Sequence, residues 1–139
     1  HEAKQSGASK VTCWGTGTPL REFLHADDLG EACVFALEKW SALSADAPQD
    51  NQGNQLGFLN VGTGIDLSIR ELAKQIARYI GFKGKIVWDE SKPDGTPKKQ
   101  LDVRRIKAMG WQAKIKLESG LPLAIQDYKQ SLTKGLARQ

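Results

Sequence analysis

Hydrophobic residues recur along the chain at two spacings, one typical of β-strands and one typical of amphipathic helices. Short apolar runs predict β-strands at 11–14, 23–25, 57–64 (a run that ends in glycines) and 85–88. Longer stretches with apolar residues three or four positions apart predict helices at 28–40, 68–80, 102–109 and 117–132. Because the strands and helices alternate, the pattern predicts an α/β fold.

Helix start signals precede two of these helices. Asp28 and Glu31 have the spacing of a capping box, in which a side-chain oxygen accepts a hydrogen bond from the first turn. Ser68 and Glu71 repeat that spacing. The helix after Ser68 stops at Gly81, which tolerates the left-handed conformation at a helix C-terminus. We therefore expect helices to begin near residues 28 and 68.

Proline constrains the last helix. Pro122 has no N–H and is tolerated only in the first turn, so we expect the helix to begin with Ser119 as its N-cap. Asp102 is expected to cap the short helix that runs through Met109.

Composition narrows the class of protein. The chain has 139 residues, enough for one domain with a modest core, and a net charge of +4 with no run of five or six like charges. Cys13 and Cys33 make neither a disulfide framework nor a zinc site, so we expect a cytoplasmic protein without a metal. No apolar run approaches the length of a membrane span. The chain starts at His1 with residues typical of the end of a helix, so we expect a fragment.

The segment 14–28 carries the candidate chemistry. Arg21 lies between a Gly-x-Gly-x-Pro turn and an apolar run, with Trp14 at the other end of the turn. A guanidinium stays charged and binds phosphate or carboxylate with two parallel hydrogen bonds. Arg21 is therefore a candidate for anion recognition, although a lone arginine in a loop is often only solvated.

A second candidate is the loop 92–99. Pro93 and Pro97 restrict this loop, and Lys98 and Lys99 stand at its end. A stiff loop loses less entropy when it orders on a ligand, so it either faces a ligand or is a solvated surface loop.

Two glycine pairs do not form dinucleotide loops. Gly15-Thr-Gly17 and Gly62-Thr-Gly64 lack the third glycine of the dinucleotide-binding fingerprint. Their glycines are expected to serve tight turns and close backbone approaches.

No catalytic constellation is present. Tyr79 and Lys83 match the Tyr-x-x-x-Lys spacing of dehydrogenases, but Gly81 would break the helix between them. His25 is expected to be a packed strand residue. We therefore expect no catalytic, cofactor-binding or metal-binding residue in this chain.

Taken together, the motifs resemble the GDP-L-fucose synthase family. They are Trp14-Gly-x-Gly-Thr-Pro-x-Arg-Glu-Phe-Leu-His-x-Asp-Asp, Asn60-Val-Gly-Thr-Gly, Ser68-Ile-Arg-Glu-Leu, Ser91-Lys-Pro-Asp-Gly-Thr-Pro-Lys-Lys and Leu101-Asp-Val with Gly110-Trp111. The family consists of extended short-chain dehydrogenases/reductases that convert GDP-4-keto-6-deoxy-D-mannose to GDP-L-fucose with NADPH. The resemblance covers residues 1–132 and is to the C-terminal part.

This resemblance implies a substrate-binding role for Trp14, Arg21, Asp94 and Lys99. It implies a fold made of the C-terminal substrate-binding portion, with one or two strands and a helix of the Rossmann domain. Segments joining the Rossmann core are expected at 11–66, and a small α/β substrate-binding domain at 67–139.

The resemblance also implies what lies outside the chain. NADP and the catalytic Ser, Tyr and Lys belong to the N-terminal domain, so the fragment alone is expected to be inactive. The expected partner is a GDP-sugar, with no nucleic acid and no membrane, and the full-length family is homodimeric. Two alternatives remain open: another nucleotide-sugar epimerase or dehydratase, and a non-catalytic module that binds a phosphate-bearing ligand or nucleic acid.

Overall fold

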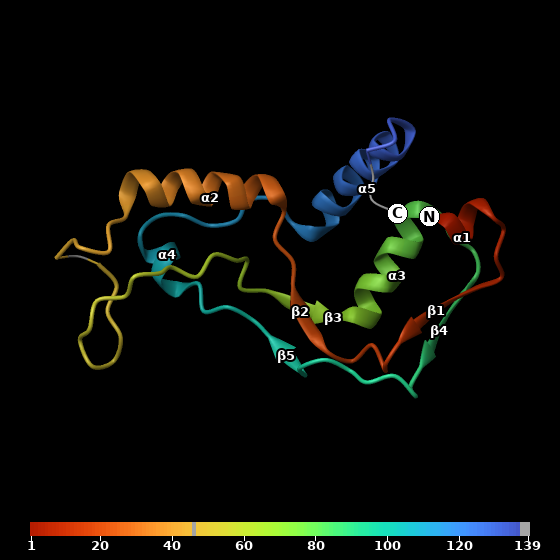
Figure 1. Cartoon of the computed structure of the whole chain (residues 1–139), viewed down its shortest axis with the longest axis horizontal. Helices are drawn as coiled ribbons and strands as arrows, with labels where there is room; N and C mark the ends of the chain where they lie inside the picture. The colour runs from red at the N-terminus through yellow and green to blue at the C-terminus, as the bar shows by residue number, and fades with distance from the viewer. Residues whose placement is uncertain (46, 137–139) are drawn as a thin grey trace. The chain divides into compact units, whose positions relative to one another are not determined.

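The computed structural model describes residues 1–45 and 47–136 and contains the predicted mixture of strands and helices (Figure 1). In chain order the elements are α1 (Glu2–Gln5), β1 (Lys10–Trp14), β2 (Leu20–Glu22), α2 (Ala26–Lys39), β3 (Asp66–Ser68), α3 (Ile69–Ile80), β4 (Lys85–Asp89), β5 (Lys98–Lys99), α4 (Arg104–Ala108) and α5 (Leu117–Thr133). Among the described residues, no helix combines the length and the apolar character needed to cross a membrane.

The chain forms two compact units, each built from segments that are distant in sequence. The first unit comprises residues 1–21, 66–99 and 117–139, and the second comprises 22–65 and 100–116. The sequence analysis divided the chain after residue 66, into segments that join the Rossmann core of the complete protein and a substrate-binding domain. A division by contacts does not test that point, so it stays a prediction.

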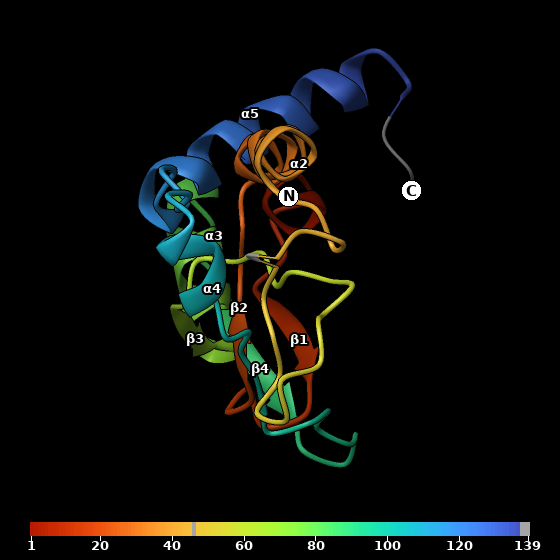
Figure 2. The same cartoon turned by 90° about the vertical axis from the view of Figure 1, so that its left-hand side faces the viewer.

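A parallel pair of strands organises one part of the first unit. β1 pairs with β4 in parallel, with Val11 opposite Ile86 and Cys13 opposite Trp88. Figures 1 and 2 show the two strands side by side from two directions. Exposed and partly buried residues alternate along β1, as expected for a strand with one covered face. The strands predicted at 11–14 and 85–88 are confirmed.

A second, three-stranded sheet has the order β3-β2-β5. The strand predicted at 23–25 is wrong, because β2 covers Leu20–Glu22 instead. The pairing partner decides this position: Leu20 lies opposite Lys98 in a parallel ladder, and its N–H donates to the carbonyl oxygen of Pro97 at 2.8 Å. Leu24 packs instead against the core of the second unit.

The helix α2 begins two residues earlier than predicted. His25 is its N-cap, and the imidazole Nδ1 accepts a hydrogen bond from the N–H two residues further on, at 3.2 Å. Asp28 lies inside the helix and is only 2% exposed. Its Oδ2 accepts from the backbone N–H groups of residues 114 and 115 at 3.1 and 2.8 Å. The predicted capping box at Asp28 is therefore wrong, and so is the prediction that His25 is a strand residue.

The second unit has a small core. It consists of Ala32 from α2, Ile106 from α4, and Val103 and Trp111 on either side of α4, packed against partly buried hydrophobic residues that include Val61. The strand predicted at 57–64 is wrong, because nothing in the described part of the chain pairs with it as a ladder. Of its apolar residues, Val61 packs against the core of this unit, whereas Phe58 is 60% exposed.

Side-chain and glycine caps set the ends of α3. The Ser68 hydroxyl accepts from the Glu71 N–H at 3.1 Å, and Gly81 ends the helix at φ 72°. Both predictions for this helix are confirmed. The shorter α4 has Val103 as its N-cap, although the carboxylate of Asp102 accepts from the N–H of Arg104 at 3.0 Å. The adjacent guanidinium lowers the pKa of Asp102 to about 2.

The helix α5 contains a proline where the sequence predicts a helix start. α5 begins at Leu117 rather than after Ser119, so Pro122 lies inside it. A proline has no N–H for the carbonyl four residues earlier, which here belongs to Glu118. The hydroxyl of Tyr79 in α3 donates to that carbonyl oxygen at 3.0 Å. The predicted start is wrong because another helix supplies the missing donor.

This substitution of one donor for another is testable by a double-mutant cycle. Tyr79→Phe keeps the ring but removes the hydroxyl, and we expect it to lower the free energy of unfolding by about 0.5–1 kcal/mol. Pro122→Ala restores a backbone N–H, so Tyr79→Phe should cost much less in that background. Urea denaturation of the four variants measures the difference. Equal costs in both backgrounds would contradict this account of the proline.

Candidate functional site

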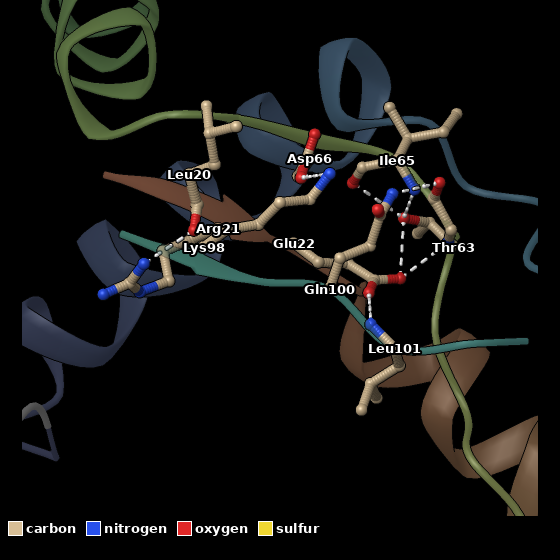
Figure 3. Close-up of polar contacts among 10 residues, drawn as sticks. Leu20, Arg21, Glu22, Thr63, Ile65, Asp66, Lys98, Gln100 and Leu101 are labelled. Carbon is tan, nitrogen blue, oxygen red and sulfur yellow. Dashed lines mark hydrogen bonds and ion pairs between the residues drawn. The ribbon is translucent and has the colours of Figure 1, made fainter. Parts of the chain in front are cut away.

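Two basic residues occupy paired positions on neighbouring strands of the first unit. Arg21 of β2 is the register partner of Lys99 of β5 in the parallel ladder. Neighbouring strands are about 4.8 Å apart, and register partners project from the same face of a sheet. The guanidinium Nη1 of Arg21 donates to the carbonyl oxygen of Leu20 at 2.6 Å (Figure 3). The fold therefore brings together the two basic residues that the sequence predicts for one anion.

The neighbouring lysine has a different role. Lys98 is the register partner of Leu20, and its ammonium lies 3.2 Å from a carboxylate oxygen of Asp66 in β3 (Figure 3). Successive residues of a strand project to opposite faces, so Lys98 and Lys99 point away from each other. Of the two adjacent lysines, Lys99 is the one on the face of Arg21.

Trp14 is at the end of β1, and 74% of its surface is exposed. The ammonium of Lys92 lies 5.7 Å from the centroid of its ring. The sequence analysis did not single out Lys92, although its position in the loop 92–99 was a signal for it. An exposed indole with a cation near its face is a surface that a ring-shaped group could cover.

Asp94 is bonded to the turn that follows Trp14. Its carboxylate accepts from the N–H of Thr16 at 2.9 Å and from the hydroxyl of Thr16 at 2.6 Å. These two bonds hold the pKa of Asp94 below its usual value, the hydroxyl contributing most. Asp94 was predicted to bind substrate, and the structure places it against the turn. Nothing tests its contact with a ligand, so that role stays a prediction.

The same turn contacts two residues that the sequence analysis missed. The guanidinium of Arg70, in the first turn of α3, stacks over the ring of Trp88 at 4.8 Å and donates to the carbonyl oxygen of Thr16. Gly17 lies against that ring so closely that an added Cβ would be 2.5 Å from the nearest carbon. No local sequence signal links Arg70 to Thr16, because 54 residues separate them along the chain.

The four predicted substrate-binding residues thus lie in one unit. Trp14 and Arg21 are at the two ends of one turn, Asp94 is bonded to that turn, and Lys99 is beside Arg21. The arrangement can present two positive charges and an exposed ring to an anionic ligand. That these residues bind a substrate stays a prediction.

A carboxylate of the chain accepts a backbone hydrogen bond from each of the two turns that contain a glycine pair, 15–17 and 62–64. In the second unit, Glu22 accepts from the N–H of Gly64 at 2.6 Å and from the hydroxyl of Thr63 at 3.1 Å (Figure 3). Its other oxygen accepts from the N–H of Leu101 at 3.0 Å. Burial raises the pKa of Glu22, but these hydrogen bonds outweigh it, and the net shift is downward.

A phosphate at this second turn would meet a carboxylate instead of free N–H groups. A Cβ added to Gly62 would be 2.3 Å from an oxygen of Glu22. In the first turn, a Cβ added to Gly15 would likewise be 2.2 Å from an oxygen of Asp94. Neither turn fits the pyrophosphate of a dinucleotide. Within the described ranges, no group of three or more His, Cys, Asp or Glu could hold a metal ion.

Known proteins with similar sequences and folds agree on a family. The model of the NAD dependent epimerase/dehydratase family matches residues 1–47. GDP-L-fucose synthase of Escherichia coli (strain K12) is 48% identical over 126 residues, which are 91% of this chain and 38% of that protein. Putative GDP-L-fucose synthase 2 of Arabidopsis thaliana is 42% identical over 132 residues, 95% of this chain and 36% of that protein.

Solved structures give the same class. GDP-mannoheptose C4 reductase from Campylobacter jejuni, solved with NADP bound, superposes with a TM-score of 0.71 at 32% identity. The match covers 87% of this chain and 35% of that structure. The chain therefore spans little more than a third of the length of the relatives it matches.

The chain is similar in sequence and fold to one part of the extended short-chain dehydrogenases/reductases, a class that includes epimerases and GDP-sugar reductases. Its curated homologues at 41–48% identity include GDP-L-fucose synthases from bacteria and plants, so the resemblance stated from the motifs is confirmed. The α/β fold class is also confirmed, and the limited coverage is consistent with the predicted C-terminal portion.

The packing of the turn on Trp88 makes a testable prediction. Gly17→Ala adds a methyl group against the ring at a residue with φ 73°, whereas Gly53, with φ 83°, has open space around it. Both substitutions strain the backbone, but only the first creates a clash. We expect Gly17→Ala to lower the free energy of unfolding by about 1–2 kcal/mol more than Gly53→Ala, measured in urea. Equal losses would show that the turn does not need the ring contact.

Proposed function

We propose that this chain supplies the substrate-binding part of an NADP-dependent epimerase/reductase that converts GDP-4-keto-6-deoxy-D-mannose to GDP-L-fucose. The observation that carries the proposal is the register pairing of Arg21 with Lys99 on adjacent parallel strands. The identity of the chain with GDP-L-fucose synthases supports the choice of substrate.

The chemistry of the two cations suits a diphosphate. A guanidinium binds two phosphate oxygens through its planar fork. An ammonium is a compact positive charge on a flexible stem, so it can donate to the second phosphate. Arg21 currently donates to the carbonyl oxygen of its own neighbour through Nη1, which leaves its other N–H groups for a ligand. Trp14 offers its exposed ring to the base or the sugar at one end of the diphosphate.

Residues outside this chain would supply the remaining functions. NADP, which is present in the structure of the related heptose reductase, is proposed to bind a different part of the complete protein. The two glycine turns here do not fit it, since carboxylates of the chain lie against both. The catalytic groups, the homodimer and the cytoplasmic location stay predictions in the same way.

Removing the cations tests the proposal in the complete protein. Arg21→Ala and Lys99→Ala should each weaken the binding of GDP, Arg21→Ala by about tenfold or more. Truncating one partner of a buried charge pair costs about 2–5 kcal/mol, and Arg21 is only partly buried, so the lower end applies. Titration calorimetry with GDP measures the dissociation constant.

Matched variants control for the loss of charge alone. Arg78→Ala and Lys83→Ala each remove a cation from an exposed position of the same unit. They should leave the affinity for GDP within about twofold, because at these exposed positions the charge is screened by solvent. If Arg21→Ala had no larger effect than Arg78→Ala, Arg21 would not contact the diphosphate.

The chain by itself is proposed to lack reductase activity. Incubated with NADPH and the keto-sugar, it should leave the near-ultraviolet absorbance of NADPH unchanged. Consumption of NADPH above a control without protein would contradict this part of the proposal.

A second candidate is a reductase for another GDP-sugar, which the likeness to the heptose reductase favours. Turnover of GDP-4-keto-6-deoxy-D-mannose and of a GDP-heptose by the complete protein distinguishes the two. The nucleic-acid module is tested by filter binding at several salt concentrations, because phosphate-backbone contacts give a steep salt dependence.

A further inference from the structure

Every polar group of Thr16 is bonded within the first unit. Its N–H and its hydroxyl donate to the two carboxylate oxygens of Asp94, at 2.9 and 2.6 Å. Its carbonyl oxygen accepts from the guanidinium of Arg70. One residue of the turn is thus held by an anion from the loop after β4 and by a cation from the start of α3.

The two holding side chains are themselves fixed. Arg70 stacks over Trp88 at 4.8 Å, and its own N–H donates to the carbonyl oxygen of Gly17 at 2.8 Å. Asp94 approaches the turn only because Gly15 has no side chain, since an added Cβ there would lie 2.2 Å from its Oδ1. Gly15 and Gly17, both with positive φ, are therefore required by these contacts.

The charge of Asp94 argues against a direct contact with phosphate. An ionised carboxylate only accepts hydrogen bonds, and it repels the oxygens of a diphosphate. Both of its oxygens already accept from Thr16. The carboxylate is better suited to hold the turn on which Trp14 and Arg21 depend.

We propose that Asp94 and Arg70 are positioning residues that act through Thr16, fixing the turn between Trp14 and Arg21 in the geometry that a diphosphate ligand needs. The proposal rests on the proposed function, and it assigns Asp94 a role that acts through the turn rather than by contact with the substrate. It adds Arg70, Thr16 and Trp88 to the residues on which binding depends.

A double-mutant cycle on the complete protein tests the route through Thr16. GDP is the probe, and calorimetry gives its dissociation constant. Thr16→Val removes one hydrogen bond to the carboxylate and should raise that constant about fivefold. Asp94→Ala removes both bonds to Thr16 and should raise it at least as much. In the Asp94→Ala background, Thr16→Val should have a clearly smaller effect, because the hydroxyl then retains only its bonds within the turn, to the N–H and the hydroxyl of Thr18 at 3.1 and 2.7 Å.

Conservative variants separate positioning from a loss of folding. Thr16→Ser keeps the hydroxyl and should retain the affinity of the unmodified protein. Thr12→Val makes the same change as Thr16→Val at an exposed position of β1 and should also have no effect on affinity. Urea denaturation of every variant shows whether the turn variants remain folded when their affinity falls.

The arginine is tested with a matched pair in α3. Arg70→Lys keeps the charge but replaces the planar fork that both stacks on Trp88 and donates to the turn. Arg78→Lys makes the same change at a guanidinium that stacks on Tyr79 at 4.9 Å. We expect a severalfold loss of GDP affinity for Arg70→Lys and none for Arg78→Lys.

The outcomes distinguish this inference from the proposed function. If Arg21→Ala leaves GDP affinity unchanged, the proposed function fails. If Arg21→Ala weakens binding while the Thr16 and Asp94 effects multiply, Asp94 contacts the ligand directly, and the positioning role is overturned. It is also overturned if Thr16→Val has no effect in the unmodified protein. Non-additive effects together with a normal Thr16→Ser support it.

Discussion

The short parallel ladder between β2 and β5 is the constraint on which the candidate site depends. It pairs only two residues of each strand, yet its register decides that Arg21 has Lys99 beside it. A shift by one residue would place Lys98 there instead, and would turn Lys99 to the opposite face. The position of the positive charges therefore follows from backbone pairing, which the hydrogen bond from Leu20 to Pro97 extends by one residue.

Carboxylates of the chain repeatedly take the place of regular backbone partners. Glu22 accepts from backbone N–H groups of two loops of the second unit, and Asp28 does so for the residues before α5. Asp94 accepts from the turn of the first unit. The backbone N–H groups of a loop have few partners within the loop. A carboxylate that accepts hydrogen bonds from several of these N–H groups therefore orders the loop, at the cost of desolvating one charge. The N–H groups of Thr16 and Gly64 that donate to these carboxylates are thereby unavailable to a phosphate.

Local sequence signals predicted most of the helices and strands, but they predicted the first and last residues of these elements less well. The α3 helix was predicted correctly at both ends, because Ser68 and Gly81 act on groups within one turn of themselves. The start of α5 was predicted incorrectly. The carbonyl group of Glu118, which Pro122 leaves without a backbone donor, accepts a hydrogen bond from the hydroxyl of Tyr79 in another helix. Among the described residues, the run at 57–64 pairs with no strand, and the pattern of apolar residues does not reveal whether a partner strand is present. For the site, Arg21 and Lys99 could be nominated from sequence, whereas Arg70 could not.

The sequence alone determined the alternation of strands and helices, the stiff turns, the residues able to hold an anion, and the likeness to a family of nucleotide-sugar enzymes. Those properties depend on residue type and on spacings of a few positions. Only the tertiary structure decided that Lys99, rather than Lys98, accompanies Arg21, and that Asp94 and Arg70 meet at Thr16. Such meetings join residues 54 to 78 positions apart, and they arise from strand register and helix placement, which no local pattern encodes.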